Sequence, residues 1–152
     1  MFNLDIKIKI NNITEINGKI KNKNIELGYF KAFILSDAIT EEELNKNDIE
    51  IYIKYLNGKK KNNYLVLTEI CIYEKYRGQR TAERTINNLK VLFNKTIILY
   101  PCPLNPDLYF RYNDLYAANE IINELKLKLH TYYISIGFKT TKDCGCLGIL
   151  EY

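Results

Sequence analysis

Apolar and polar residues alternate strictly at the start of the chain. A period of two predicts a half-buried strand over residues 2–10. Its apolar positions are Phe2, Leu4, Ile6, Ile8 and Ile10. A turn-rich interval follows, in which Asn17 and Gly18 form a pair typical of hairpins. A second strand is predicted over 25–35, where apolar and aromatic residues predominate.

Helical signals begin at Thr40. Thr40 and Glu43 have the spacing of a capping box, so a helix should start near Glu41. Residues 45–48 make a poor helix interior and divide the segment into two short pieces. The second piece runs to Leu56 and can be read as a helix or as a strand. Helix is the preferred interpretation, with one apolar side formed by Ile49, Ile53 and Leu56.

The stretch 65–93 combines a strand, a turn and a helix. Residues 65–73 are mostly apolar, β-branched or aromatic, which predicts a strand covered on both faces. A tight turn holds Arg77 and Gly78. The following helix has an apolar stripe of Ala82, Ile86, Leu89 and Phe93. A helix start beside a glycine leaves amides unpaired and is a natural anion site, although an ordinary strand-to-helix connection has the same features.

The last third of the chain completes an α/β pattern. An inner strand is predicted over 96–100 and is stopped by prolines, and a loop over 104–112 follows. A helix is expected from Asp114 to about Ile134, with its stop at Gly137. Final strands are predicted over 138–141 and 147–152. With no linker or repeat, one α/β (α+β) domain over 1–152 is the economical interpretation.

Composition narrows the class of protein. The chain has 152 residues, of which 47% are hydrophobic and 26% charged, as in globular domains. It has neither a long apolar run nor a leader-like start, so we expect a cytoplasmic protein with no membrane partner. A net charge of +4 with dispersed lysines does not favour a nucleic-acid partner.

Metal binding is not expected. The chain has one histidine and four cysteines, and these residues lack the paired spacing typical of zinc ligands. They are His130, Cys71, Cys102, Cys144 and Cys146.

Two segments resemble the GNAT family of acetyl-coenzyme A-dependent N-acyltransferases. "ICIYEKYRGQRTA" is similar to that family's strand followed by Q/R-x-x-G-x-G/A, with Arg77 at the Q/R position and Ala82 at the G/A position. "TYYISIGFKTT" resembles the family's frequent "FYEKLGF" and places Tyr133 where many members carry a catalytic tyrosine. Arg80 stands at the central glycine of the first motif.

The resemblance implies a mixed central sheet of about six to seven strands, flanked by helices and splayed near its middle. Acetyl-coenzyme A would lie in the gap as co-substrate. The strand side of the gap would be Ile70, Cys71 and Ile72, bordering the pantetheine arm. The diphosphate side would be Arg77, Gly78, Gln79, Arg80, Thr81 and Ala82. Arg80 is expected to take a negative φ in the first helical turn and to point its side chain out of the cradle, where it could contact a phosphate.

Acetyl transfer to an amine needs a base, an oxyanion donor and a proton for the thiolate. Glu69 is the candidate base, and the alternative is that it pairs with a cation on a neighbouring element. The oxyanion donor would be a strand amide near 70–72. Tyr133 is the candidate acid, with a reference pKa near 10 against about 8.5 for a thiol. Tyr132 takes this role if the register is off by one.

These features predict an N-acetyltransferase that transfers acetyl to a primary amine by direct attack. The acceptor would be an amine-bearing small molecule or a protein or peptide, and the enzyme a monomer or homodimer. A catalytically weak or inactive binding or regulatory module with the same fold is the alternative, and Arg80 favours it. An acyltransferase acting on an aminoacylated RNA is a further alternative, which steep salt dependence of RNA binding would support.

Overall fold

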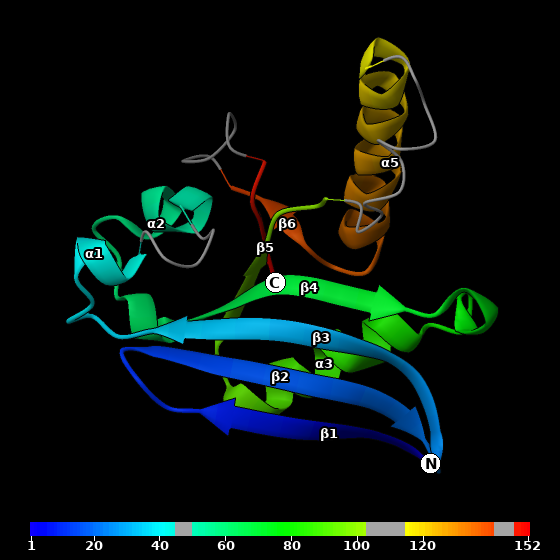
Figure 1. Ribbon diagram of the computed structural model, residues 1–152, viewed down its shortest axis with the longest axis horizontal. Coiled ribbons are helices and arrows are strands. Elements are labelled where there is room, and N and C mark those ends of the chain that lie inside the picture. Colours follow the sequence, from blue (N-terminus) through cyan, green and yellow to red (C-terminus); the bar gives the residue numbers. More distant parts are fainter. Residues whose placement is uncertain (45–49, 103–114, 142–147) are drawn as a thin grey trace.

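The computed structural model describes residues 1–44, 50–102, 115–141 and 148–152 (Figure 1). All strands of these residues form one seven-stranded sheet in the order β1-β2-β3-β4-β5-β7-β6. The strands are β1 (Phe2–Lys9), β2 (Ile13–Asn22), β3 (Ile25–Leu35), β4 (Tyr64–Ile72), β5 (Thr96–Leu99), β6 (Lys139–Thr140) and β7 (Leu150–Glu151). The helices are α1 (Glu41–Leu44), α2 (Glu50–Leu56), α3 (Thr81–Phe93) and α5 (Leu115–Ser135), with single 3₁₀ turns η1 (Lys61–Asn63) and η2 (Glu74–Tyr76).

The predicted α/β fold with a mixed sheet of six to seven strands flanked by helices is confirmed. Strands β1 to β4 are antiparallel neighbours, β4 and β5 are parallel, and β7 returns antiparallel to β5. The strand expected over 25–35 is found with those bounds as β3. The two final strands are shorter than predicted, and the loop expected over 104–112 lies outside the described residues.

The hairpin expected at Asn17 and Gly18 is wrong. Both residues lie inside β2, where they pair with Lys31 and Phe30 of β3. A Cβ at position 18 would stand 2.2 Å from Cε1 of Phe30, so glycine is needed there to seat the aromatic ring. The chain turns instead at Lys23, which has a φ of 54°.

The capping box at Thr40 is confirmed. The Glu43 amide donates to Thr40 Oγ1 at 3.4 Å, and the Thr40 amide donates to Glu43 Oε2 at 3.5 Å. The second piece is a helix, as preferred, but its apolar side was misassigned. Tyr52, Tyr55 and Leu56 are its buried residues, because the two tyrosines pack into the core cluster on that face of the sheet. Ile53 is only partly buried, and Ile49 lies outside the described residues.

Strands β4 and β5 separate after a short parallel contact. They are paired only from Tyr64 to Val66 on β4 and from Thr96 to Ile98 on β5. Figure 1 shows β5 turning away from the line of β4, while α5 stands over the later half of β4. This is the splay that the resemblance implies. The strand predicted to be covered on both faces is fully buried only from Leu65 to Leu67, and its pairing with β5 ends at Val66.

Helix α3 packs against the sheet with a different stripe from the one predicted. Its buried residues are Thr81, Thr85, Ile86 and Leu89. Ala82 and Phe93 are only partly buried. The threonines can enter the core because Thr85 Oγ1 donates to the carbonyl of Thr81 at 2.9 Å, which satisfies one buried hydroxyl within the helix.

Helix α5 ends close to the predicted residue. It stops at Ser135, and Gly137 follows with a φ of 116°, a conformation that favours glycine. The amide of Phe138 then donates to the carbonyl of Tyr133 at 3.0 Å. Across the parts of the chain that the structure describes, no helix is both long and apolar enough to cross a membrane.

Candidate functional site

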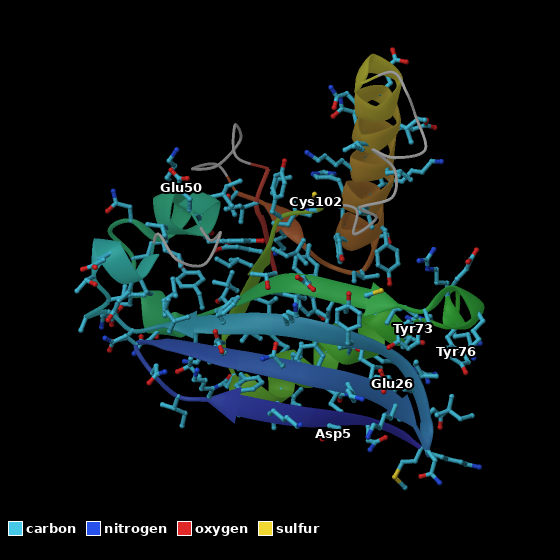
Figure 2. The ribbon with its side chains drawn as sticks, in the orientation of Figure 1. Asp5, Glu26, Glu50, Tyr73, Tyr76 and Cys102 are labelled. Carbon is cyan, nitrogen blue, oxygen red and sulfur yellow. The ribbon has the colours of Figure 1, made fainter. Side chains whose placement is uncertain are left out.

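A cavity of about 590 Å³ opens where β4 and β5 separate. Its walls come from residues 67–72 of β4, the turn before α3, the first residues of α3, the end of β5 and the second half of α5. Figure 2 labels Tyr76 of η2 and Cys102 of the segment that follows β5, and both line the cavity. Every site residue predicted from the sequence lines this cavity except Gln79, which the geometry leaves outside.

The edge of β4 that faces the cavity has no strand partner among the described residues. The amide of Tyr73 donates to the carbonyl of Leu27 on β3 at 2.9 Å. In an antiparallel pair, backbone groups of alternate residues point towards the neighbouring strand, so this bond shows which residues of β4 do so. Backbone groups of Cys71 therefore point towards β3, and those of Ile70 and Ile72 point away from it, towards the cavity. Arg77 Nε donates to the carbonyl of Ile72 at 3.1 Å, in agreement with this direction. Ile70 and Ile72 can thus bind an extended ligand through the backbone, whereas Cys71 cannot.

The end of β4 is held against β3 by side chains. Tyr73 Oη donates to Glu26 Oε1 at 2.7 Å, and Figure 2 shows these two residues beside each other. This hydrogen bond raises the pKa of Tyr73 to about 12. The contact fixes the strand just before the chain turns towards α3.

A β-bulge at Thr68 was missed by sequence reasoning. Lys31 pairs with Glu69 and Ala32 pairs with Leu67, so Thr68 is an extra residue in β4. Its hydroxyl donates to the carbonyl of Lys31 at 3.2 Å, and the residue lines the cavity. The signal was present in the sequence, because the core-facing positions change from odd numbers before Thr68 to even numbers after it.

The start of α3 presents unpaired amides to the cavity. The first intrahelical bond runs from the Arg84 amide to the carbonyl of Arg80 at 3.0 Å. The N–H groups of Thr81 and Ala82 precede it and have no intrahelical acceptor, while that of Glu83 donates to the Tyr132 hydroxyl. Gly78 has a φ of 80°, and a Cβ there would meet no atom within 4 Å. Backbone amides and open space together make a cradle suited to an anion.

The expectation of a negative φ at Arg80 is wrong. Arg80 is the N-cap of α3 with a φ of 57°, the left-handed conformation that glycine adopts most easily. The arginine therefore preserves the backbone path of a glycine at the cost of local strain. Its side chain is 75% exposed and makes a bidentate ion pair with Glu83, both contacts being 2.7 Å. This hydrogen-bonded pair lowers the pKa of Glu83.

The two adjacent tyrosines of α5 occupy different parts of the cavity wall. Tyr133 is only 7% exposed, and its hydroxyl has no hydrogen-bond partner within the described residues. Burial raises the pKa of Tyr133, and the neighbouring Tyr132 and Tyr52 add to this shift. Burial and the Glu83 carboxylate raise the pKa of Tyr132, while the Glu83 amide and Arg80 oppose the shift. Tyr132 therefore lies beside the start of α3, whereas Tyr133 packs into the core cluster with Phe138.

Glu69 is paired, which is the alternative that the sequence left open. Its Oε1 lies 3.5 Å from Nζ of Lys31, the residue directly opposite on β3, and its side chain is 31% exposed. Among the described residues, Glu69 and Glu83 are the carboxylates lining the cavity, and both are in ion pairs.

Lys128 also lines the cavity and was not predicted. It lies four residues before Tyr132 on α5, and residues at that spacing share a helix face. Given the tyrosine, the spacing alone could have found it. Lys128 pairs with Glu124 at 3.7 Å and is 70% exposed, so it adds a cation at the mouth of the cavity.

Metal-binding clusters of three or more histidine, cysteine or acidic residues are not found within the described ranges. Cys144 and Cys146 lie outside those ranges. Cys71 is a free thiol.

Comparisons with known proteins give one structural likeness. No family model matches the chain, and no curated protein does. A solved structure of Elp3 from the archaeon Methanocaldococcus infernus, with an N-terminal deletion of residues 1–46, matches with a TM-score of 0.48 and 9% identity. The match covers 99% of this chain and 29% of that one, so the chain spans less than a third of that protein's length.

Proposed function

We propose that this protein transfers an acetyl group from acetyl-coenzyme A to a primary amine by direct attack. The observation that carries the proposal is the meeting of two backbone surfaces in one cavity. The unpaired edge of β4 at Ile70 and Ile72 opens beside the unpaired amides at the start of α3. An extended amide-bearing arm fits the first surface and a diphosphate fits the second. The family motif that residues 70–82 resemble also has these two parts, a strand for the pantetheine arm and a helix start for the diphosphate.

The residues present fit the coenzyme. Gly78 leaves open space where a side chain would otherwise stand, and Arg80 keeps the backbone path of a glycine. Arg77 and Lys128 add positive charge to the cavity wall. When bound, acetyl-coenzyme A supplies an activated acyl thioester.

Tyr133 is the proposed proton donor to the leaving sulfur. The residue is 7% exposed and lines the cavity, and its hydroxyl makes no hydrogen bond within the described residues, so it is available to a ligand. Burial raises its pKa above the ordinary value near 10, whereas a thiol titrates near 8.5. Full proton transfer is therefore uphill, and Tyr133 stabilises the developing thiolate by a strong hydrogen bond.

Backbone and carboxylate groups would complete the chemistry. The bulged amide at Thr68 and the amides of Ile70 and Ile72 are the proposed donors to the oxyanion. Glu69 is the proposed base, acting through a water molecule while Lys31 holds its carboxylate in place. The acceptor is proposed to be an amine on a small molecule or on a peptide.

A second candidate is a binding or regulatory module that holds the coenzyme without turnover. The ion pairs of Glu69 and Glu83 favour it, because they leave no unpaired carboxylate on the described cavity wall. A base that must first leave an ion pair is less available for proton abstraction.

Thermal unfolding with and without acetyl-coenzyme A tests both candidates. Ligand at about 100 times its Kd stabilises the folded state by roughly 2.7 kcal/mol. For a chain of this size that raises Tm by about 5–10 °C. AMP at the same concentration is the control for unspecific nucleotide binding. An unchanged Tm with acetyl-coenzyme A would overturn both candidates.

Turnover separates the two candidates. Release of free thiol is measured with a panel of primary amines, peptides and an aminoacylated RNA. Thiol release that depends on the amine supports the acetyltransferase. A raised Tm without thiol release from any acceptor class supports the binding module.

A further inference from the structure

The sheet ends in a long strand whose outer edge has no strand partner. Among the described residues, β1 pairs only with β2 and stands first in the strand order. Figure 1 shows β1 at the border of the sheet. Its ladder with β2 runs from Phe2 to Lys9 without a register shift, so the strand is regular over its whole length. A regular, unpaired edge of this length is a template for one more strand.

The even-numbered residues of β1 present their backbone groups to this edge. The amide of Lys23 donates to the carbonyl of Met1 at 2.9 Å, and this contact lies one step beyond the Phe2–Asn22 pair of the ladder. Odd-numbered residues of β1 therefore form the hydrogen bonds to β2. The N–H and C=O groups of the even-numbered residues point outwards and are open to another strand.

The side chains of these outward-bonding residues are apolar and lie on one face of the sheet. Leu4 and Ile6 pack against the core cluster to which α3 contributes. Further along the strand the same face is open, since Ile8 is 51% exposed and Ile10 is 81% exposed. A strand added at this edge with its own apolar face on the same side would cover these side chains.

The opposite face of β1 carries charges of both signs close together. Asp5, which Figure 2 labels, and Lys7 are two residues apart, so they share this face, and both are exposed. The Asp5 carboxylate lies 2.8 Å from Nζ of Lys21 on β2, yet its side chain remains 48% exposed. Opposite charges directly across two antiparallel strands attract, and like charges repel. The spacing of Asp5 and Lys7 therefore makes this edge complementary to a second copy of itself.

We propose that two copies of this chain form a dimer in which their β1 strands pair antiparallel, with the two-fold axis at Ile6. Ile6 then faces Ile6 of the second copy, and Leu4 faces Ile8 of the second copy. Asp5 faces Lys7 of the second copy, and the symmetry of the dimer repeats this pair. The two sheets become one continuous sheet.

The charges select this register over its neighbours. A ladder centred on Asp5 or on Lys7 would place like charges opposite each other. A ladder centred on Leu4 would place both charges opposite the neutral side chains of Asn3 and Met1. The dimer is independent of the proposed function, because β1 is separated from the cavity at β4 and β5 by β2 and β3.

Sedimentation equilibrium of the whole chain measures the dimer Kd. Asp5→Lys and Lys7→Asp each create two like-charge pairs across the axis and should raise this Kd by about tenfold or more. An equimolar mixture of the two variants restores both opposite-charge pairs in the mixed dimer, so its Kd should lie within about threefold of the unaltered protein. Lys19→Asp is the matched charge reversal on the same face of β2, away from the edge, and should leave the Kd unchanged.

Disulfide trapping tests the register separately. The Cα atoms of a hydrogen-bonded antiparallel pair are about 5.5 Å apart, a separation that a disulfide can bridge. On oxidation, Ile6→Cys should therefore form a dimer bridged through position 6 of both copies, identified by mass spectrometry of the bridged peptide. Ile8→Cys is the control. Position 8 is more exposed, but it would lie about 14 Å from its counterpart and should not form this bridge.

Four results would overturn the proposal. They are a monomer at every concentration, a dimer Kd that ignores both charge reversals, a mixture that stays dissociated, and bridging of Ile8→Cys in preference to Ile6→Cys. Thermal unfolding shows whether each variant is folded. If a charge reversal prevents folding, the disulfide result decides, because both cysteine variants keep Asp5 and Lys7.

Discussion

The hydroxyl of Tyr133 can be removed with little change to its surroundings. In Tyr133→Phe the ring keeps its edge contacts with Tyr132 and Phe138, whose centroids lie 5.5 and 5.4 Å away. No hydrogen bond within the described residues is lost. The free energy of unfolding should therefore stay the same or rise by up to about 1 kcal/mol.

Catalysis should respond much more strongly than stability. A positioned general acid contributes about 10²- to 10⁴-fold to turnover. Because burial raises the pKa of Tyr133, it acts mainly as a hydrogen-bond donor, which places the expected loss of kcat near the lower end, at about 10²-fold. The Kd for coenzyme A should change by less than about twofold, because an interaction that strengthens as the thiolate forms adds little to ground-state binding.

Tyr132→Phe is the matched control from the adjacent position. Tyr132 is a residue of α5 whose hydroxyl lies against the start of α3, beside the Glu83 amide and Arg80. Removing the hydroxyl breaks its hydrogen bond with that amide, so coenzyme A binding should change by at most about 2- to 12-fold, equivalent to roughly 0.5–1.5 kcal/mol, with kcat nearly unchanged.

Two measurements separate these roles. Steady-state thiol release over a range of acetyl-coenzyme A concentrations gives kcat, and calorimetry with coenzyme A gives Kd. An unchanged kcat in Tyr133→Phe would refute its assignment as the proton donor. A large loss of kcat in Tyr132→Phe instead would move the motif register by one residue.

Three further perturbations follow from the charges and tyrosines of the structure. Arg80→Gly should weaken coenzyme A binding, because it leaves the Glu83 carboxylate unpaired beside the diphosphate. Adding Glu83→Gln to this variant should restore the Kd measured by calorimetry. If the Kd is not restored, Arg80 itself binds phosphate. Glu69→Gln should lower kcat by about tenfold or more near neutral pH. This loss of kcat should shrink as the pH approaches the pKa of the acceptor amine, because the amine then needs no base. A loss of kcat that is independent of pH would exclude Glu69 as the base. Burial raises the pKa of Tyr52 to about 12, against about 10 in an unfolded chain. Between these pH values the unfolded chain loses a proton that the folded protein retains, so the free energy of unfolding should fall by roughly 2–3 kcal/mol from pH 10 to 12. Denaturant titrations at several pH values measure this fall. If Tyr52→Phe shows the same fall with pH as the unaltered protein, the assignment to Tyr52 is contradicted.

Much of the fold follows from local signals. The bounds of β3 and the start of α1 agree with the prediction, because hydrophobic pattern and capping depend on residues close in sequence. The predicted hairpin at Asn17 and Gly18 is wrong because a contact distant in sequence decides the structure there. The ring of Phe30, twelve residues after Gly18, decides the role of that glycine, and local turn preference cannot include such a contact.

The candidate site divides in the same way. Residues 70–72 and 77–82 lie close together in sequence, and a motif could place them on one wall, although Gln79 falls outside it. The bulge at Thr68 and the pairing of Glu69 with Lys31 depend on the register between two strands. That register is set by packing between residues far apart in sequence. In the sequence it is indicated by the change of apolar, core-facing positions of β4 from odd to even numbers at Thr68.

The backbone at Arg80 is the strongest physical argument that the cradle has a role. A left-handed conformation costs a non-glycine residue about 1–2 kcal/mol. The ion pair with Glu83 is exposed and screened by solvent, so it does not offset this strain. The conformation is held instead by the packing of Thr85 and Ile86 against the sheet, which fixes where α3 must begin. An extended or helical residue at position 80 would relieve the strain but would redirect the amides of Thr81 and Ala82. The arrangement of those amides is therefore what the strain maintains, as expected if they bind the diphosphate.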